Sequence, residues 1–137
     1  MHTPLEFYVV LPCDLFRLGR KTIAKMDYIR TTPPRTEEES WDIRIKENGL
    51  VDAKSGGLSL FNFRNPRFGV LWWKIPKGTK LPPGLHVSLD EGGSPGKRHF
   101  TVRPLYDMSL ETYLEKLREL EPFAVPCFLG ATDEKAG

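Results

Sequence analysis

The sequence predicts an α+β fold that consists mainly of short antiparallel strands with a few helices at the periphery. Short β-prone segments recur along the chain, glycine and proline clusters separate them, and one segment near the C-terminus has strong helix signals. A chain of 137 residues can bury a core without disulfides or metals. We therefore expect one domain over residues 1–129 and a frayed tail over residues 130–137.

Composition narrows the classes of function. The chain has 20 Lys and Arg against 18 Asp and Glu, so its net charge of +2 gives weak grounds for a general affinity for nucleic acid or anionic membranes. No segment approaches the ~20 apolar residues of a membrane helix, and the N-terminus lacks the pattern of a signal peptide, so we expect a soluble chain. Cys13 and Cys127 lack metal-ligand spacing, which favours two reduced thiols, and a disulfide between them stays open.

The N-terminal part contains two short apolar runs and a weaker helix signal. Residues 7–11 are apolar and stop at Pro12, and residues 15–18 form a second run that Arg17 interrupts. Near-helical spacing of apolar residues predicts a short helix over residues 21–29. The polar residues 35–40 should form a solvated loop.

The middle of the chain alternates strand and turn signals. Residues 41–45 alternate like a strand, and residues 70–75 are rich in the aromatic and branched side chains that are typical of strands. Asn48-Gly49 and Gly56-Gly57 predict turns. The second of these turns leads Ser59 into a β-prone segment, where its hydroxyl group can be presented to a ligand.

Two alternating strands over residues 85–90 and 99–103 should place their polar side chains on one face, opposite the core. These side chains are His86, Ser88, Asp90, His99, Thr101 and Arg103. Closure of the glycine-rich loop 91–98 would set Asp90 opposite His99 and His86 opposite Arg103. We expect this polar face to line a cleft.

The clearest helix signal covers residues 109–120. Ser109 can cap the helix, and Glu111 suits the positive end of the helix dipole. The apolar stripe that we expect in the core consists of Leu110, Tyr113, Leu114 and Leu117.

Common catalytic motifs are absent from the sequence: there is no G-x-x-x-x-G-K-[ST], G-x-G-x-x-G, G-x-S-x-G or H-E-x-x-H. The candidate functional residues that remain are Arg17, Ser59 and His99, which lie on three separate segments. Such dispersion suits a cleft that is assembled by the fold.

The chain resembles a known family in three ordered motifs, G-G-x-S-x-F at residues 56–61, I-P-x-G-T-x-[LI]-P-P-x-L at residues 75–85 and H-[FY]-T-[VI]-x-P at residues 99–104. They are similar to motifs of the small ADP-ribosyltransferase-like toxins first recognised among bacterial type VI secretion effectors, with relatives in fungi. The resemblance covers roughly residues 41–118, with a shorter match at Leu15-Phe16-Arg17.

The resemblance implies an ADP-ribosyltransferase-like split antiparallel β-sandwich with a central cleft for NAD, which is the substrate. Arg17 would hold the pyrophosphate or a ribose phosphate. Ser59 would bond the nicotinamide-side ribose, and His99, held by Asp90, would orient or polarise that ribose. The cofactor-binding set is completed by Gly57, Leu58 and Phe61. His99 stands where many relatives have a glutamate, and Leu58 stands where related toxins can carry a hydroxyl residue.

The function implied by the resemblance is that of a cytotoxic effector which binds NAD and transfers ADP-ribose to an intracellular macromolecule. It further implies action in the cytoplasm, export without a signal peptide, a cognate immunity protein, and neither a metal nor a membrane partner. Three alternatives stay open: an NAD glycohydrolase, a metal-independent ribonuclease that uses His86 and His99, and a catalytically inactive binding module.

Overall fold

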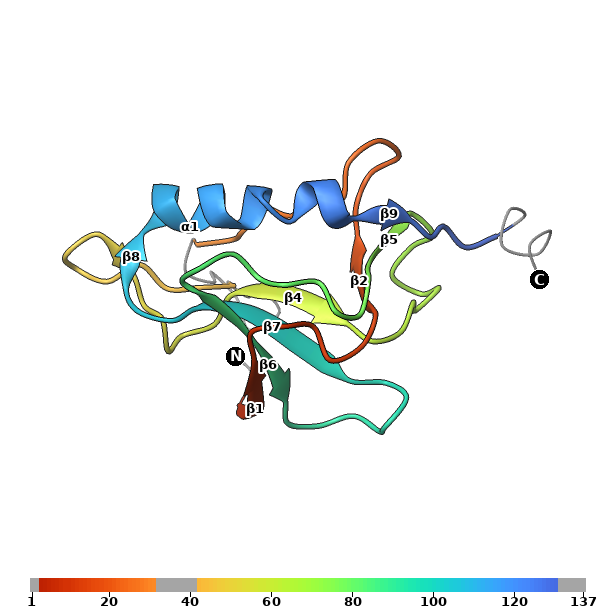
Figure 1. Cartoon of the computed structure of the whole chain (residues 1–137), viewed down its shortest axis with the longest axis horizontal. Helices are drawn as coiled ribbons and strands as arrows, with labels where there is room; N and C mark the ends of the chain where they lie inside the picture. The colour runs from red at the N-terminus through yellow and green to blue at the C-terminus, as the bar shows by residue number, and fades with distance from the viewer. Residues whose placement is uncertain (1–2, 32–41, 131–137) are drawn as a thin grey trace.

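The computed structural model describes residues 3–31 and 42–130, and it confirms the predicted α+β class (Figure 1). Strands form a seven-stranded sheet in the order β1-β6-β7-β4-β2-β5-β9, in which all neighbours are antiparallel. The bounds are β1 (Pro4–Tyr8), β2 (Leu15–Leu18), β4 (Leu58–Phe61), β5 (Trp72–Ile75), β6 (Leu85–Asp90), β7 (His99–Pro104) and β9 (Val125–Pro126). A second small sheet pairs β3 (Leu50–Val51) with β8 (Met108–Ser109).

Only short helices occur in the described part of the chain. α1 (Leu110–Arg118) lies along one face of the sheet in Figure 1, and a 3-10 turn, η1 (Glu121–Phe123), follows it. The predicted N-cap is confirmed, because the Ser109 hydroxyl accepts a hydrogen bond from Thr112 N at 3.1 Å. None of the helices in residues 3–31 and 42–130 is long and apolar enough to cross a membrane.

The large sheet is nearly divided between β2 and β4. Phe16 and Phe61 are the single residue pair that joins these two strands, whereas β2 follows β5 over its whole length and β4 follows β7 over its whole length. Beyond that pair, where Arg17 and Leu18 lie, β2 and β4 separate. The sheet therefore has two parts, β1-β6-β7-β4 and β2-β5-β9.

The core lies between α1 and the sheet. Tyr113 and Leu117 of α1 are fully buried and belong to the same cluster as Leu58 and Val102. The Tyr113 hydroxyl donates to Val102 O at 2.6 Å and accepts a hydrogen bond from Leu58 N at 3.0 Å. Burial raises the pKa of this tyrosine, so the hydroxyl stays protonated and can continue to donate. α1 is thus attached to the sheet by hydrogen bonds as well as by packing.

Gly57 is required by the protein's own packing. A Cβ atom at this position would lie 2.1 Å from Val102 O and 2.9 Å from the Tyr113 hydroxyl. We expect Gly57→Ala to destabilise the fold by about 2–3 kcal/mol, because backbone must shift to admit the methyl group. Gly96→Ala is the matched control, since a Cβ there meets nothing within 4 Å. Urea denaturation of both variants measures the effect, and equal midpoints would contradict it.

Two local predictions were wrong. Residues 21–29 form bends and turns in place of a helix, because Ala24 N and Met26 N donate to the distant Glu121 carboxylate and Lys25 has a left-handed φ of 61°. Residues 42–45 form only an isolated bridge between Ile45 and Val51. Trp41, the polar loop at 35–40 and residues 131–137 of the predicted tail lie outside the described residues.

Candidate functional site

A pocket of about 660 Å³ lies where β2 and β4 separate. It is lined by β2, by β4 and by the irregular segment that follows β2. The lining residues are Arg17, Leu18, Lys25, Asp27, Tyr28, Ile29, Arg30, Asp42 and Ser59. Two of the three dispersed residues singled out by sequence, Arg17 and Ser59, therefore lie in one pocket.

Arg17 spans the separation between the strands. Its Nε donates to Lys25 O at 2.8 Å, and its two terminal nitrogens donate to Ser59 O at 3.2 Å and Tyr28 O at 2.9 Å. A guanidinium has five N–H donors, so two remain for a ligand in the pocket. Burial lowers the pKa of Arg17 to about 10, with partial compensation from nearby acids such as Asp42. The side chain is therefore still charged at neutral pH.

Ser59 lines the same pocket from β4. It alternates along β4 with Leu58 and Leu60, which are buried in the core, so its side chain points to the other face of the sheet. No hydrogen bond among the described residues engages this hydroxyl, whereas the Ser59 carbonyl is held by Arg17. The hydroxyl is thus available to a bound molecule.

The charges around the pocket favour an anionic ligand. Both lining acids are paired, Asp42 with Arg30 at 3.2 Å and Asp27 with Arg118 at 2.8 Å. Lys25 Nζ lies 4.8 Å from the centre of the Tyr28 ring, in a cation–π contact. Neither Arg17 nor Lys25 forms an ion pair with these two acids, so the three lining cations, Arg17, Lys25 and Arg30, outnumber the lining acids.

His99 belongs to a buried polar network beside the pocket. Its Nδ1 lies 2.6 Å from Asp90 Oδ2, which confirms the contact expected from the hairpin register. Asp90 is fully buried and also accepts hydrogen bonds from Ser88 at 2.6 Å and Thr101 at 2.5 Å. Arg103 completes the network, with Nε 2.9 Å from the Ser88 hydroxyl. Burial alone would raise the pKa of Asp90, but the hydrogen bonds from His99, Ser88 and Thr101 outweigh it and lower that pKa.

Strand register places His99 near Ser59. Ser59 pairs with Thr101, and Phe61 pairs with His99, so all four side chains share one face. His99 is a diagonal neighbour of Ser59, at a typical separation of about 7–8 Å. It is mostly buried and is not one of the residues that line the pocket. The structure therefore brings Arg17 and Ser59 together in the lining of one pocket. It places His99 on the neighbouring strand, β7, outside that lining.

The remaining predicted cofactor residues have different surroundings. Leu58 is fully buried in the core, and Gly57 packs against Val102. Phe61 packs edge-on against His99, with ring centroids 5.1 Å apart, and against Trp72. Of these residues, Phe61 shares the face that carries Ser59.

Sequence reasoning missed the segment that closes the pocket. Lys25 and Tyr28 come from residues that the sequence predicted to be helical, and Arg30 follows directly after them. The concentration of cations over residues 20–30 was a signal for an anion site. The expectation that the polar face of β6 and β7 lines a cleft is confirmed for His86 and Arg103, which line a second pocket. It was wrong for Ser88, Asp90 and Thr101, which are buried and bonded to one another through Asp90.

The geometry argues against a ribonuclease that uses both histidines. His86 lies opposite Arg103, four residues along β7 from His99. At 3.4 Å per residue this is about 14 Å, which is too far for both to act on one phosphate.

A protein-family model described as "Tse2 ADP-ribosyltransferase toxin" matches residues 13–124, well over half of the chain. The matched region contains Arg17, Ser59 and His99. No curated protein matches the chain.

Proposed function

We propose that this chain, which belongs to the Tse2 ADP-ribosyltransferase toxin family, binds NAD between β2 and β4 and transfers ADP-ribose to a macromolecule of the target cell. Membership of the family supports a toxic ADP-ribosyltransferase. The observation that carries the NAD site is the pocket where the sheet divides, which holds Arg17 and Ser59 together. Its volume of about 660 Å³ is within the usual range for cofactor sites.

The division of the sheet also supports the finer fold proposal. In a split sandwich of the ADP-ribosyltransferase type, the β1-β6-β7-β4 and β2-β5-β9 parts would be the two lobes. The NAD cleft would lie between them, where Arg17 crosses from β2 to the Ser59 carbonyl. Cytoplasmic action, delivery by type VI secretion and a cognate immunity protein belong to the same proposal.

The phosphates of NAD would bind at the cationic side of the pocket. The two remaining N–H groups of Arg17 suit phosphate oxygens, because charge-assisted hydrogen bonds from a planar guanidinium are strong and directional. Lys25 would move from the Tyr28 ring onto the second phosphate. Neither cation would have to give up a carboxylate partner.

The nicotinamide ribose would lie near Ser59 and His99. As the bond from C1′ to the nicotinamide nitrogen breaks, its electron pair neutralises the pyridinium ring, and C1′ gains oxocarbenium character. Ser59 would hold a ribose hydroxyl in the reactive orientation. His99, whose Nδ1 faces the Asp90 carboxylate, would take the place of the glutamate of many relatives and orient this ribose from β7. The acceptor nucleophile then forms its bond to C1′ and loses a proton to solvent.

Incubation of the protein with tagged NAD and cell lysate tests this function. We expect labelling of a macromolecule by the native protein and a rate about tenfold lower for Ser59→Ala, because one hydrogen bond to the reacting ribose is lost. Ser94→Ala, in the exposed loop between β6 and β7, is the control. Nicotinamide release without labelling would identify a glycohydrolase, and absence of both products would contradict the proposed enzyme.

A further inference from the structure

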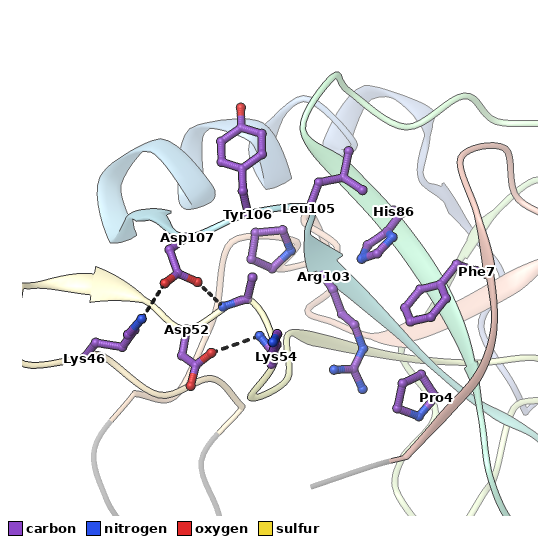
Figure 2. A pocket seen from close by; sticks show the side chains of 12 residues that line it. Pro4, Phe7, Lys46, Asp52, Lys54, His86, Arg103, Leu105, Tyr106 and Asp107 are labelled. Atoms are coloured by element: carbon purple, nitrogen blue, oxygen red, sulfur yellow. Dashed lines mark hydrogen bonds and ion pairs between the residues drawn. The ribbon is translucent and has the colours of Figure 1, made fainter.

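A second pocket has a volume of about 590 Å³, and Figure 2 shows the side chains that line it. No residue lines both pockets. Its walls come from β1, from the start of β6, from the end of β7 and from the loops on either side of the small sheet. The proposed NAD chemistry makes no use of it.

One wall of this pocket is a pair of stacked rings. His86 and Phe7 have ring centroids 4.6 Å apart and planes inclined by 17°. Register explains the pair, because Phe7 faces Ser88 on β6 and His86 is the diagonal neighbour on the same face. Phe7 is 52% exposed although it is a large aromatic side chain. A flat ring in the pocket can therefore extend the stack.

The floor and the opposite wall are charged. Arg103 lies opposite His86 on β7, is 3% exposed, and is oriented by its bond to Ser88 and by Asp90, whose Oδ1 lies 3.7 Å from a terminal nitrogen of the guanidinium. Figure 2 shows its guanidinium between the stacked rings and the loop that carries Lys54. Asp90 partly balances the charge of Arg103, so Arg103 would contribute directional hydrogen bonding to a phosphate at the floor of the pocket, and Lys54 would contribute most of the net positive charge.

The acids of this pocket are already engaged by the protein. Asp107 accepts hydrogen bonds from Lys46 Nζ at 2.7 Å and from Ala53 N at 2.9 Å. Asp52 accepts one from Lys54 N at 3.0 Å. Lys46 is therefore neutralised by its partner, and the Lys54 side chain adds positive charge at the rim.

We propose that this pocket is a second ligand site that binds a nucleotide, with the base stacked on the His86–Phe7 pair and the phosphate held by Arg103 and Lys54. A planar ring and an anion at opposite sides of one pocket match the two parts of a nucleotide. The ligand is either a free nucleotide or the terminal nucleotide of a nucleic acid. The site is independent of the proposed NAD chemistry, because it shares no residue with that pocket.

Calorimetric titration with adenosine 5′-monophosphate tests the site, with adenosine as the probe that lacks a phosphate. We expect the monophosphate to bind the native protein, and Lys54→Glu and His86→Ala each to weaken binding by about tenfold. Lys97→Glu, at an exposed loop lysine, and Ser59→Ala, in the other pocket, should leave it unchanged. Thermal unfolding of each variant, together with NAD turnover of the Lys54, His86 and Lys97 variants, shows whether it is folded.

A second arm separates the two sources of the ligand. A short single-stranded RNA with a 5′-phosphate should bind more tightly than the monophosphate if the natural ligand is a nucleic acid end, and no more tightly if it is a free nucleotide. The proposal is overturned if neither probe binds. It is also overturned if binding survives both Lys54→Glu and His86→Ala, or if Ser59→Ala removes it as effectively. Each of these outcomes leaves the NAD proposal intact.

Discussion

Arg17→Met is expected to lower the free energy of unfolding by about 3 kcal/mol and to abolish NAD binding. The substitution removes the donors to three main-chain carbonyls, those of Lys25, Tyr28 and Ser59, and so releases the segment that closes the pocket from β4. It also removes the charge proposed to bind the pyrophosphate. Urea denaturation and calorimetric titration with NAD measure the two effects.

Two further variants separate the roles of Arg17. Arg17→Lys keeps the charge but lacks the planar fork, so it should recover part of the NAD affinity and little of the stability. Arg67→Met, at an exposed arginine, should change neither quantity. An Arg17→Met protein with native stability and native NAD affinity would show that the guanidinium neither holds the pocket nor binds the ligand.

Asp90→Ala should destabilise the protein by about 3–5 kcal/mol, since it leaves the buried Arg103 without its carboxylate partner. It also removes the group that orients His99, so transferase activity should fall even in the molecules that remain folded. Asp90→Asn keeps the shape of the side chain, so its free energy of unfolding should lie between those of the native protein and of Asp90→Ala. Glu91→Gln, at the neighbouring exposed acid, is the control.

The pH dependence of stability gives a second readout for Asp90. Its pKa in the folded protein lies below the ordinary value for aspartate, because hydrogen bonds to the carboxylate outweigh the effect of burial. The stabilisation is therefore complete above the unfolded pKa and is lost as the pH falls through the lower, folded pKa. Asp90→Asn should lose less stability than the native protein between pH 5 and pH 2, roughly the range of this titration. Parallel stability curves would contradict the assignment.

The hairpin and the capped helix were predictable because local pattern determines them. Alternation along β6 and β7 fixes which side chains share a face, and this was enough to pair His86 with Arg103 and Asp90 with His99. Ser109 was recognisable as a cap because its role depends only on the residues that follow it.

The segment that closes the pocket between β2 and β4 was not predictable, because contacts distant in sequence determine its shape. Ala24 and Met26 donate to the carboxylate of Glu121, nearly a hundred residues away, and Lys25 has a conformation that its own sequence does not favour. The burial of Asp90 was not predictable either, because alternation identifies which side chains share a face of the strand but not what covers that face. Local periodicity could not show that Arg17 would bridge two strands.

NMR titration of the isotope-labelled protein with NAD tests most directly whether NAD binds where the sheet divides. The largest amide shift changes should occur at Arg17 and Ser59 and over residues 25–30, with residues 46–54 and 103–107 little affected. Arg17→Met should remove these changes. Shift changes confined to residues 46–54 and 103–107, or none at saturating NAD, would contradict the proposed NAD site.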